Sequence, residues 1–298
     1  MQKRVFGKTG LEVSVLGFGG AEIGFEGASQ KDVETLLNGA LDAGLNVIDT
    51  AECYVDSEEQ IGKAVGHRRK DYYLFTKCGH VDATFKEGWS KADIEKSIDR
   101  SLKRLKTDYL DLVQLHSPSE KILAKGEVIE VLQKAKQAGK TRFIGYSGDS
   151  TDALYAIKTG AFDTLQTSLS IADQESIELT LPLAQEKKMG VIIKRPIANA
   201  AWRYSEKPAN DYHVTYWQRL GKLGYKFING NPEATGERAL RFTLSVPGVH
   251  TMIVGTARPG RWQANSQIVA KGNLSDEEYD EIRSRWGSVA EKAWVGQV

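Results

Sequence analysis

The chain has 298 residues, a length that fits either two average domains or one large α/β barrel. Its 40 basic residues stand against 39 acidic ones, and the net charge of +1 comes without a block of either sign. Charge therefore gives no reason to expect nucleic acid or a membrane surface as a partner.

The N-terminal sequence MQKRVFGKTG lacks the apolar core of a signal peptide, and no run approaches the ~18 apolar residues of a membrane span. The two cysteines, Cys53 and Cys78, have no metal-ligand spacing and do not indicate a disulfide framework. We therefore expect a cytoplasmic protein with two small buried thiols. Redox sensitivity of a nearby pocket is the alternative role for these thiols.

Eight short apolar or β-branched runs recur along the chain, and most are separated by stretches of helical periodicity such as 30–44, 91–106 and 126–140. Strands that are apolar on both faces and alternate with helices predict a parallel sheet covered by helices. Eight such units predict a single (β/α)8 TIM barrel domain over residues 1–298. The runs are VSVLGFG (13–19), LNVIDTA (45–51), YYLFTKCG (72–79), DLVQLHS (111–117), TRFIGYSG (141–148), FDTLQTS (162–168), GVIIKRP (190–196) and TMIVGTA (251–257).

Other segments predict the parts around the barrel. A KTG turn between two short extended pieces predicts an N-terminal β-hairpin before the first barrel strand. Two long connections, 79–92 and 198–234, are expected to build the mouth of a pocket. Ser57 is a candidate N-cap for the helix that follows the second run, and Ser275 with Glu278 has the spacing of a capping box.

Polar residues end the eight runs, where a (β/α)8 barrel carries its chemistry. Singly, these residues have ordinary explanations: an acid can cap a turn, a histidine can be structural and a tyrosine can be packing. Lys77 has no such ordinary explanation, because a lysine is rarely buried without a partner. The residues are Gly19, Gly20, Asp49, Lys77, His116, Ser147, Gln166, Lys194, Arg195, Gly255 and Thr256.

Four residues on consecutive strands, Asp49, Tyr54, Lys77 and His116, have the chemistry of a proton-delivery site. A tyrosine is a poor acid at neutral pH, with an ordinary pKa of ~10. A nearby lysine stabilises the phenolate and lowers that pKa, and a carboxylate holds the lysine charged and oriented. A histidine on the next strand can orient or polarise a carbonyl.

These residues lie in segments that together resemble the aldo-keto reductase superfamily of bacterial type. The segments run in the family's order and cover nearly the whole chain: GLNVIDTAECYVDSEEQIG, LFTKCG, DLVQLHSP, IGYSG, FDTLQTS and PGVHTMIVGTARPGRWQAN. The resemblance implies a (β/α)8 barrel whose N-terminal hairpin closes the floor, and hydride transfer between a nicotinamide cofactor and a carbonyl or alcohol. It implies Tyr54 as general acid, Lys77 bridged to Asp49 as the pair that tunes it, and His116 as the group that orients the substrate oxygen.

The cofactor side shows no Rossmann fingerprint, because Glu22 stands where the third glycine of GFGGAEIG would be required. Gly19 and Gly20 are instead expected to let the first loop approach the cofactor closely. In the resembled family a serine, an asparagine and a glutamine hold the nicotinamide carboxamide. The resemblance implies cofactor contacts from Asp49, Ser147, Gln166, Lys194, Arg195, Pro196, Gly255, Thr256, Arg261 and Asn265.

The chain departs from the family pattern at several cofactor positions. Gly148 replaces the asparagine, and Lys194 replaces an aromatic residue that stacks on the nicotinamide in many relatives. Either the lysine stem or a neighbour such as Trp202 would then cover the ring. The neighbouring Arg195 is either an ordinary surface charge or, as its position at the rim favours, a contact to the pyrophosphate or the substrate.

The segment after the eighth run aligns with the family's adenosine site. Thr256 and Arg261 fall where the family contacts a 2′-phosphate, and Asn265 where it contacts adenine. An arginine and a phosphate form a strong charge-assisted pair, so NADP(H) is expected over NAD(H). Gly255 replaces a lysine and Ala264 an acidic residue of many relatives, and Arg258 is a possible compensating cation.

We therefore expect reversible, NADPH-dependent reduction of an aldehyde or ketone, with a small carbonyl compound as substrate and no metal. The alternatives are a nicotinamide-binding regulatory subunit with vestigial catalysis, and a barrel isomerase or aldolase. The latter lacks metal-ligand spacing and a phosphate loop. The aromatic segment 198–234 favours a partly apolar pocket, whereas Lys194, Arg195 and Arg203 favour a hydroxylated or anionic substrate. The sequence does not indicate an oligomeric state.

Overall fold

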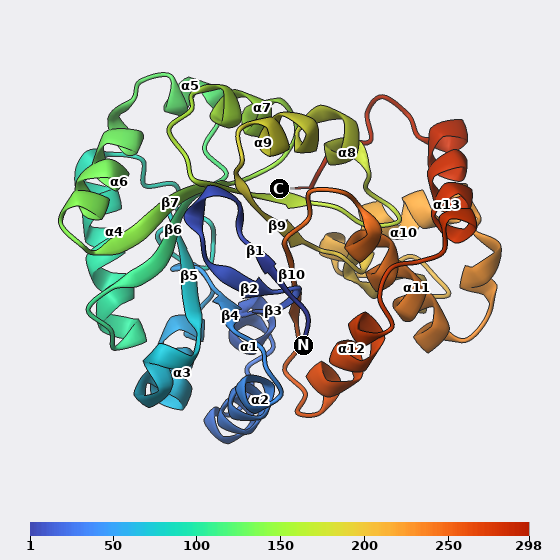
Figure 1. Cartoon of the computed structure of the whole chain (residues 1–298), viewed down its shortest axis with the longest axis horizontal. Coiled ribbons are helices and arrows are strands. Elements are labelled where there is room, and N and C mark those ends of the chain that lie inside the picture. Colours follow the sequence, from blue (N-terminus) through green and yellow to red (C-terminus); the bar gives the residue numbers. More distant parts are fainter. Residues whose placement is uncertain (298) are drawn as a thin grey trace.

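The structure is a computed structural model that describes residues 1–297, with the side chain of residue 229 left out. Eight parallel strands close into a barrel in the order β10-β3-β4-β5-β6-β7-β8-β9 (Figure 1). Each of the eight apolar runs supplies one strand, which confirms the (β/α)8 barrel. The strands are β3 (Leu16–Gly19), β4 (Val47–Asp49), β5 (Tyr73–Cys78), β6 (Leu110–His116), β7 (Thr141–Ser147), β8 (Thr164–Ser168), β9 (Gly190–Lys194) and β10 (Thr251–Gly255).

Helices cover the outer face of the barrel (Figure 1). α4 shows why they form: it buries Ile94, Ile98 and Leu105 at helical spacing, and a capping box between Ser90 and Asp93 starts it. The helices are α1 (Ala21–Phe25), α2 (Gln30–Asp42), α3 (Ser57–Val65), α4 (Lys91–Leu105), α5 (Glu120–Leu123), α6 (Glu127–Gln137), α7 (Ser150–Lys158), α8 (Glu175–Leu179), α9 (Leu181–Glu186), α10 (Asp211–Leu223), α11 (Pro232–Ser245), α12 (Arg261–Ala270) and α13 (Asp276–Val289).

The predicted N-terminal hairpin closes the barrel floor. β1 (Lys3–Val5) pairs antiparallel with β2 (Glu12–Ser14). Phe6, just after β1, inserts into the floor, where its ring stacks on that of Phe75 at 5.7 Å. A Cβ on Gly190 would fall 2.7 Å from the Phe6 ring, so this close approach requires glycine. With the floor filled by apolar side chains, chemistry is left to the opposite end of the barrel, where the strands terminate.

The long connection after β9 and the C-terminal region pack beside each other. The connection contains the 3-10 turn η3 (Ala198–Arg203), α10 and the turn η4 (Lys226–Asn229), and α10 lies against α13. The capping box predicted at Ser275 and Glu278 is confirmed at the start of α13. The N-cap predicted at Ser57 is wrong by one position: Asp56 is the N-cap of α3, and the Ser57 hydroxyl instead pairs with that of Thr50 at 2.8 Å.

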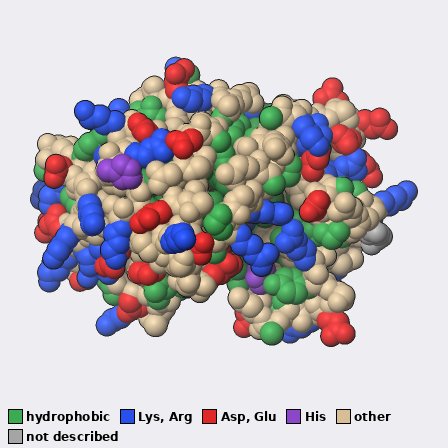
Figure 2. Space-filling model, turned by 90° about the horizontal axis from the view of Figure 1, so that it is seen from below, with side chains coloured by type: hydrophobic (Ala, Val, Ile, Leu, Met, Phe, Trp, Pro, Cys, Tyr) green, Lys and Arg blue, Asp and Glu red, His purple; other side chains and the backbone are tan. Residues whose placement is uncertain are grey.

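Basic and acidic side chains lie interspersed on the face shown in Figure 2. This distribution agrees with the near-neutral composition, because neither sign dominates the visible surface. Among the helices of residues 1–297, none has the length and apolar character needed to cross a membrane.

Candidate active site

A buried ion pair lies at the C-terminal ends of β4 and β5. The Lys77 ammonium donates to the Asp49 carboxylate, and it also donates to the Thr50 carbonyl oxygen at 2.9 Å. The side chains of Lys77 and Asp49 are each 1% exposed. A charge this deeply buried requires a partner, so the two side chains stabilise and orient each other.

Two glutamine side chains complete the shell around Asp49. Gln114 and Gln166 both donate from Nε2 to the same carboxylate oxygen, at 3.1 and 2.9 Å. Gln114 precedes His116 by two residues in β6, so both side chains lie on the same face of that strand. The Asp49 carboxylate therefore accepts from one ammonium and two amides, which fixes its orientation.

Tyr54 lies beside this pair, with its ring centroid 5.1 Å from the Lys77 ammonium. Burial raises the pKa of the Tyr54 phenol well above its ordinary value, and the nearby Cys53 and Asp49 raise it further. In the protein by itself, the pKa is thus raised overall, although a neighbouring lysine by its charge lowers the pKa of a phenol. The physical reason is that desolvation of a phenolate outweighs its attraction to nearby cations.

The segment that carries Tyr54 is held from both sides. Glu52 is fully buried and accepts from Ser97 and Arg100 of α4. Val55, immediately after Tyr54, has a φ of 50°, a backbone conformation that costs energy for a β-branched residue. Such strain persists only where the surrounding structure imposes it, and it commonly marks functional sites.

His116, at the end of β6, faces Tyr54 edge-on with 5.8 Å between the ring centroids. Burial lowers the pKa of the imidazole well below its ordinary value, and the positive charge of Lys77 lowers it further. The ring is therefore neutral near pH 7. Nδ1 lies 3.5 Å from the Cys53 thiol, whose pKa burial raises to about 12. When the thiol donates its hydrogen to Nδ1, the hydrogen of the neutral ring is on Nε2.

Ser147 and Gln166, the two residues predicted to hold the nicotinamide carboxamide, are in contact. Ser147 donates to the Gln166 carbonyl oxygen at 3.1 Å, so the two side chains form one polar strip across the ends of β7 and β8. A Cβ on Gly148 would fall 2.6 Å from the Tyr146 hydroxyl. Tyr146 thus fills the space that an asparagine at this position would need.

The Lys194 ammonium has two polar partners. Its ammonium pairs with Asp149 at 2.8 Å and donates to the Gln297 carbonyl oxygen at 3.1 Å. Burial lowers the pKa of Lys194 to about 8, whereas Lys194 keeps the pKa of Asp149 below its ordinary value despite the burial of that carboxyl. Lys194 is therefore a member of a buried charge cluster rather than a free cation.

Arg195 joins the same cluster. Its guanidinium donates to the Gln297 carbonyl oxygen and, at 3.1 Å, to the Ser168 hydroxyl, and it lies over the Tyr212 ring at 5.4 Å. The adjacent Pro196 is buried, with its carbonyl accepting from Thr243. The C-terminal segment thus reaches the mouth of the barrel and contacts two side chains predicted to bind the cofactor.

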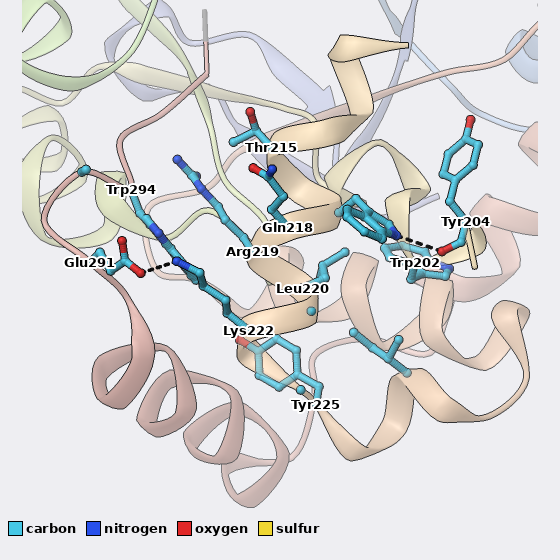
Figure 3. Close-up of a pocket in the computed structure, with 15 residues that line it drawn as sticks. Trp202, Tyr204, Thr215, Gln218, Arg219, Leu220, Lys222, Tyr225, Glu291 and Trp294 are labelled. Carbon is cyan, nitrogen blue, oxygen red and sulfur yellow. Dashed lines mark hydrogen bonds and ion pairs between the residues drawn. The ribbon is translucent and has the colours of Figure 1, made fainter. Parts of the chain in front are cut away.

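Trp202, the other candidate for covering the nicotinamide, lines a different cavity of about 930 Å³. Figure 3 shows this cavity along α10, with Trp202 and Tyr204 at one end and Trp294 at the other. None of Asp49, Tyr54, Lys77 and His116 lines it. Trp286 of α13 packs against Trp294, with 5.5 Å between the ring centroids.

The glycines of the first loop allow close packing at the mouth. A Cβ on Gly20 would fall 2.7 Å from the Ser57 hydroxyl, and one on Gly19 would fall 3.3 Å from the Gly255 nitrogen. Glu22 lies against Gly255 so closely that a Cβ there would overlap its carboxylate. Burial raises the pKa of Glu22 to about 7. Many relatives have a lysine at position 255. In this chain Gly255 has no side chain, which makes room for the Glu22 carboxyl group.

The predicted adenosine site surrounds the start of α12. Thr256, which follows β10, accepts from the backbone nitrogen of Arg258 at 3.1 Å. Arg261 is the first residue of α12, and Asn265 lies one turn further and is buried. A helix start with an arginine on its first turn suits a phosphate group. The residues present therefore fit the phosphate end of a dinucleotide.

Sequence reasoning missed several polar groups at this end of the barrel. Gln114 had a usable signal, since it alternates with His116 along one strand. Asp149 and Glu22 had none, because their partners Lys194 and Gly255 are distant in sequence. Both cysteines are free and buried, as expected.

Comparisons with known proteins agree with this geometry. A model of the aldo/keto reductase family matches residues 15–286. An uncharacterized oxidoreductase of Bacillus subtilis is 30% identical over 95% of this chain and 96% of its own, and L-galactose dehydrogenase of Arabidopsis thaliana is 30% identical over 91% and 89%. The structure of an aldo-keto reductase from Bacillus halodurans, in its holo form, matches with a TM-score of 0.84 at 30% identity, covering 98% of this chain and 99% of that one. This chain belongs to the aldo/keto reductase family.

Proposed function

We propose that this protein reduces an aldehyde or ketone to an alcohol with NADPH, reversibly, and that Tyr54 is the general acid. The observation that carries the proposal is the buried Lys77–Asp49 pair beside Tyr54, with His116 facing the same phenol. This arrangement supplies a proton donor, a cation beside it and a neutral hydrogen-bond donor within one small volume. Such a set matches the needs of a carbonyl oxygen that gains negative charge.

The bound nicotinamide supplies the hydride for this reaction. As the substrate oxygen gains charge, the Nε2 hydrogen of His116 is placed to donate to it. Tyr54 then transfers its phenolic proton to the oxygen. The high pKa of Tyr54 keeps that proton in place beforehand, and the Lys77 ammonium, 5.1 Å from the ring, stabilises the phenolate that remains.

The same contacts speak against Lys77 as a Schiff-base nucleophile. Its ammonium already donates to Asp49 and to the Thr50 carbonyl, and a nucleophilic amine needs a free lone pair. The lysine therefore acts through its charge in this proposal, and the aldolase alternative has no support in the geometry.

NADP(H) is the proposed cofactor. Support comes from the Ser147–Gln166 strip beside Asp49, which offers an amide and a hydroxyl to the nicotinamide carboxamide, and from Arg261 at the start of α12. We assign Gly19, Gly20, Gly255, Thr256 and Asn265 to the close-approach and adenosine contacts. Arg195 and Pro196 then lie at the pyrophosphate, and Lys194 orders the nearby loop through Asp149.

The test is NADPH oxidation, followed by absorbance, with a panel of aldehydes and ketones. In Tyr54→Phe the turnover number should fall by about 100-fold or more. NADPH affinity should stay within about 2-fold, because the ring and its contacts remain. Wild-type-like turnover in Tyr54→Phe would refute the proton-donor role.

A further inference from the structure

A buried thiol lies against the histidine of the proposed active site. The Cys53 sulfur, in the turn after β4, is 3.5 Å from His116 Nδ1 at the end of β6, within hydrogen-bonding distance for sulfur. Cys53 is 1% exposed, and the two residues are 63 positions apart in the chain. The contact therefore arises from the closed barrel and not from proximity in the sequence.

The turn that carries Cys53 is held on both sides of the thiol. The Glu52 backbone nitrogen donates to the Lys77 carbonyl oxygen at 3.2 Å, and the Tyr54 backbone nitrogen donates to the Ala51 carbonyl oxygen at 3.1 Å. The Glu52 carboxylate is in addition bound by two side chains of α4. These contacts fix the backbone around Cys53, so its sulfur has a defined position relative to the imidazole.

The plane of the His116 ring is fixed by its aromatic neighbours. Three rings meet it edge-on, with centroid distances of 5.8 Å to Tyr54, 5.1 Å to His80 and 6.3 Å to Phe85. Edge-on packing is a favourable geometry for aromatic pairs and restricts rotation of the ring. Such packing does not determine which ring nitrogen carries the hydrogen, so that choice is left to the polar contact at Nδ1.

The chemistry of the two groups favours one direction for this hydrogen bond. Burial raises the pKa of the Cys53 thiol to about 12, so the sulfur keeps its hydrogen near pH 7. An unprotonated imidazole nitrogen is a good acceptor, whereas a thiol sulfur is a weak one. Donation from the Cys53 thiol to Nδ1 is therefore favoured over the reverse, and the hydrogen of the neutral His116 ring then lies on Nε2.

We propose that Cys53 is a positioning residue that holds His116 in the Nε2-protonated tautomer, so that the ring presents a hydrogen and not a lone pair to the carbonyl oxygen. The inference rests on the proposed function, because it takes His116 as the group that donates to the substrate. It also gives Cys53 a role other than redox sensitivity, since a buried thiol that keeps its hydrogen is a poor nucleophile.

The test is the tautomer of His116, measured by nitrogen NMR of the full chain labelled with 15N-histidine. The His116 signals are those that disappear in His116→Asn. In the wild type the hydrogen should lie on Nε2. In Cys53→Ala the ratio of the Nε2-protonated to the Nδ1-protonated ring should fall about 5-fold, the effect of losing one hydrogen bond. Cys53→Ser keeps a hydrogen on the side chain and should stay close to the wild type.

The matched control is Cys78→Ala. Cys78 is the second free and buried cysteine of residues 1–297, and its thiol contacts the Gln114 carbonyl oxygen at 3.6 Å instead of a histidine. Its removal also takes a buried thiol from the core, but it should leave the tautomer ratio of His116 unchanged. A change equal to that in Cys53→Ala would show that loosened packing, and not the hydrogen bond, controls the tautomer.

Turnover of 4-nitrobenzaldehyde with NADPH provides the second readout. In Cys53→Ala, kcat/KM should fall about 3-fold or more, because the apparent affinity for the carbonyl scales with the fraction of competent tautomer and with the orientation of the ring. The Kd of NADPH should stay within about 2-fold. Cys53→Ser should restore most of kcat/KM. Serine is smaller than cysteine, so a role in packing alone would not be restored, and equal losses in the two variants would refute the positioning role.

The NMR measurement needs neither cofactor nor substrate, so it separates this inference from the proposed function. If the tautomer depends on Cys53 while no carbonyl is reduced, the tautomer assignment stands and the proposed function fails. If carbonyls are reduced while Cys53→Ala leaves the tautomer ratio unchanged, the positioning role is refuted and the proposed function stands. A wild-type ring that carries its hydrogen on Nδ1 would also overturn the inference.

Discussion

Lys77 and Asp49 form an ion pair in which each side chain is only 1% exposed, and two glutamine amides also donate to the carboxylate. A pair so fully removed from water has a large desolvation cost, which the mutual attraction offsets only while both partners are present. The pair therefore contributes to the stability of the barrel and also lies beside Tyr54, in the proposed active site.

Removing only the lysine should destabilise the fold strongly. Lys77→Met leaves the Asp49 carboxylate buried without its cation and should lower the free energy of unfolding by about 3–5 kcal/mol. The double variant Asp49→Asn/Lys77→Met should recover much of this loss, because no buried charge remains. Urea unfolding of the wild type, both single variants and the double variant measures the coupling. Purely additive losses would contradict a compensated pair.

Arg261 should distinguish the two nicotinamide cofactors. Arg261→Ala removes the cation at the start of α12 and should raise the Kd of NADPH about 10-fold or more, while the Kd of NADH changes little. Quenching of tryptophan fluorescence by each cofactor measures both constants. Arg258→Ala tests whether Arg258, an exposed residue just before α12, also contributes to NADPH binding. Equal effects of Arg261→Ala on both cofactors would place the arginine away from the 2′-phosphate.

Glu22 should make NADPH binding depend on pH. Its carboxyl, with a pKa raised by burial to about 7, is neutral below that pH and negative above it. Because it lies against Gly255 in the proposed nucleotide site, NADPH affinity should weaken as pH rises from 6 to 8. Glu22→Gln should flatten this part of the profile, whereas Glu12→Gln on the floor hairpin should not. The cofactor itself also titrates, but it does so equally with both proteins. Comparing the pH profile of Glu22→Gln with that of the wild type therefore isolates the effect of the Glu22 carboxyl.

Glu22 should also affect stability with a defined sign. A carboxyl whose pKa is higher in the folded than in the unfolded state favours folding below the unfolded value, and that contribution is lost as pH rises through about 7. Glu22→Gln should therefore be more stabilising at pH 8 than at pH 4. Thermal unfolding at the two pH values gives the comparison, and a pH-independent difference would show that the carboxyl is not perturbed.

The C-terminal segment should modulate cofactor affinity. Gly296 packs on Asp149 so tightly that a Cβ would fall 2.5 Å from the Cβ of that residue. Gly296→Val should displace the segment, release Arg195 from the Gln297 carbonyl and lower the Kd of NADPH by about 3-fold or more. Gly287→Ala, where a Cβ meets nothing within 4 Å, is the matched control. A weaker affinity in Gly296→Val would mean that the segment helps to build the cofactor site instead.

Much of this architecture can be predicted from the sequence, because it depends on local pattern. Apolar runs alternating with amphipathic helices specify the barrel, and the side chains that end each run must then meet at one rim. Asp49, Lys77 and His116 come together for that reason. The Ser275 cap is also local, since its partner is three residues away.

Other features were decided only by the tertiary structure, because their causes lie far apart in the chain. Burial in the folded chain raises the pKa of Tyr54, and the alternation of strands does not indicate how deeply that side chain is buried. Lys194 pairs with Asp149 and donates to the carbonyl of Gln297, 103 residues away, contacts that the strand pattern does not indicate. Phe25 and Phe85 lie together because α1 and the loop after β5, which are far apart in the chain, are in contact through these rings. Local sequence thus determined the frame and the strand-end positions of Asp49, Lys77 and His116, whereas long-range packing decided their electrostatic surroundings.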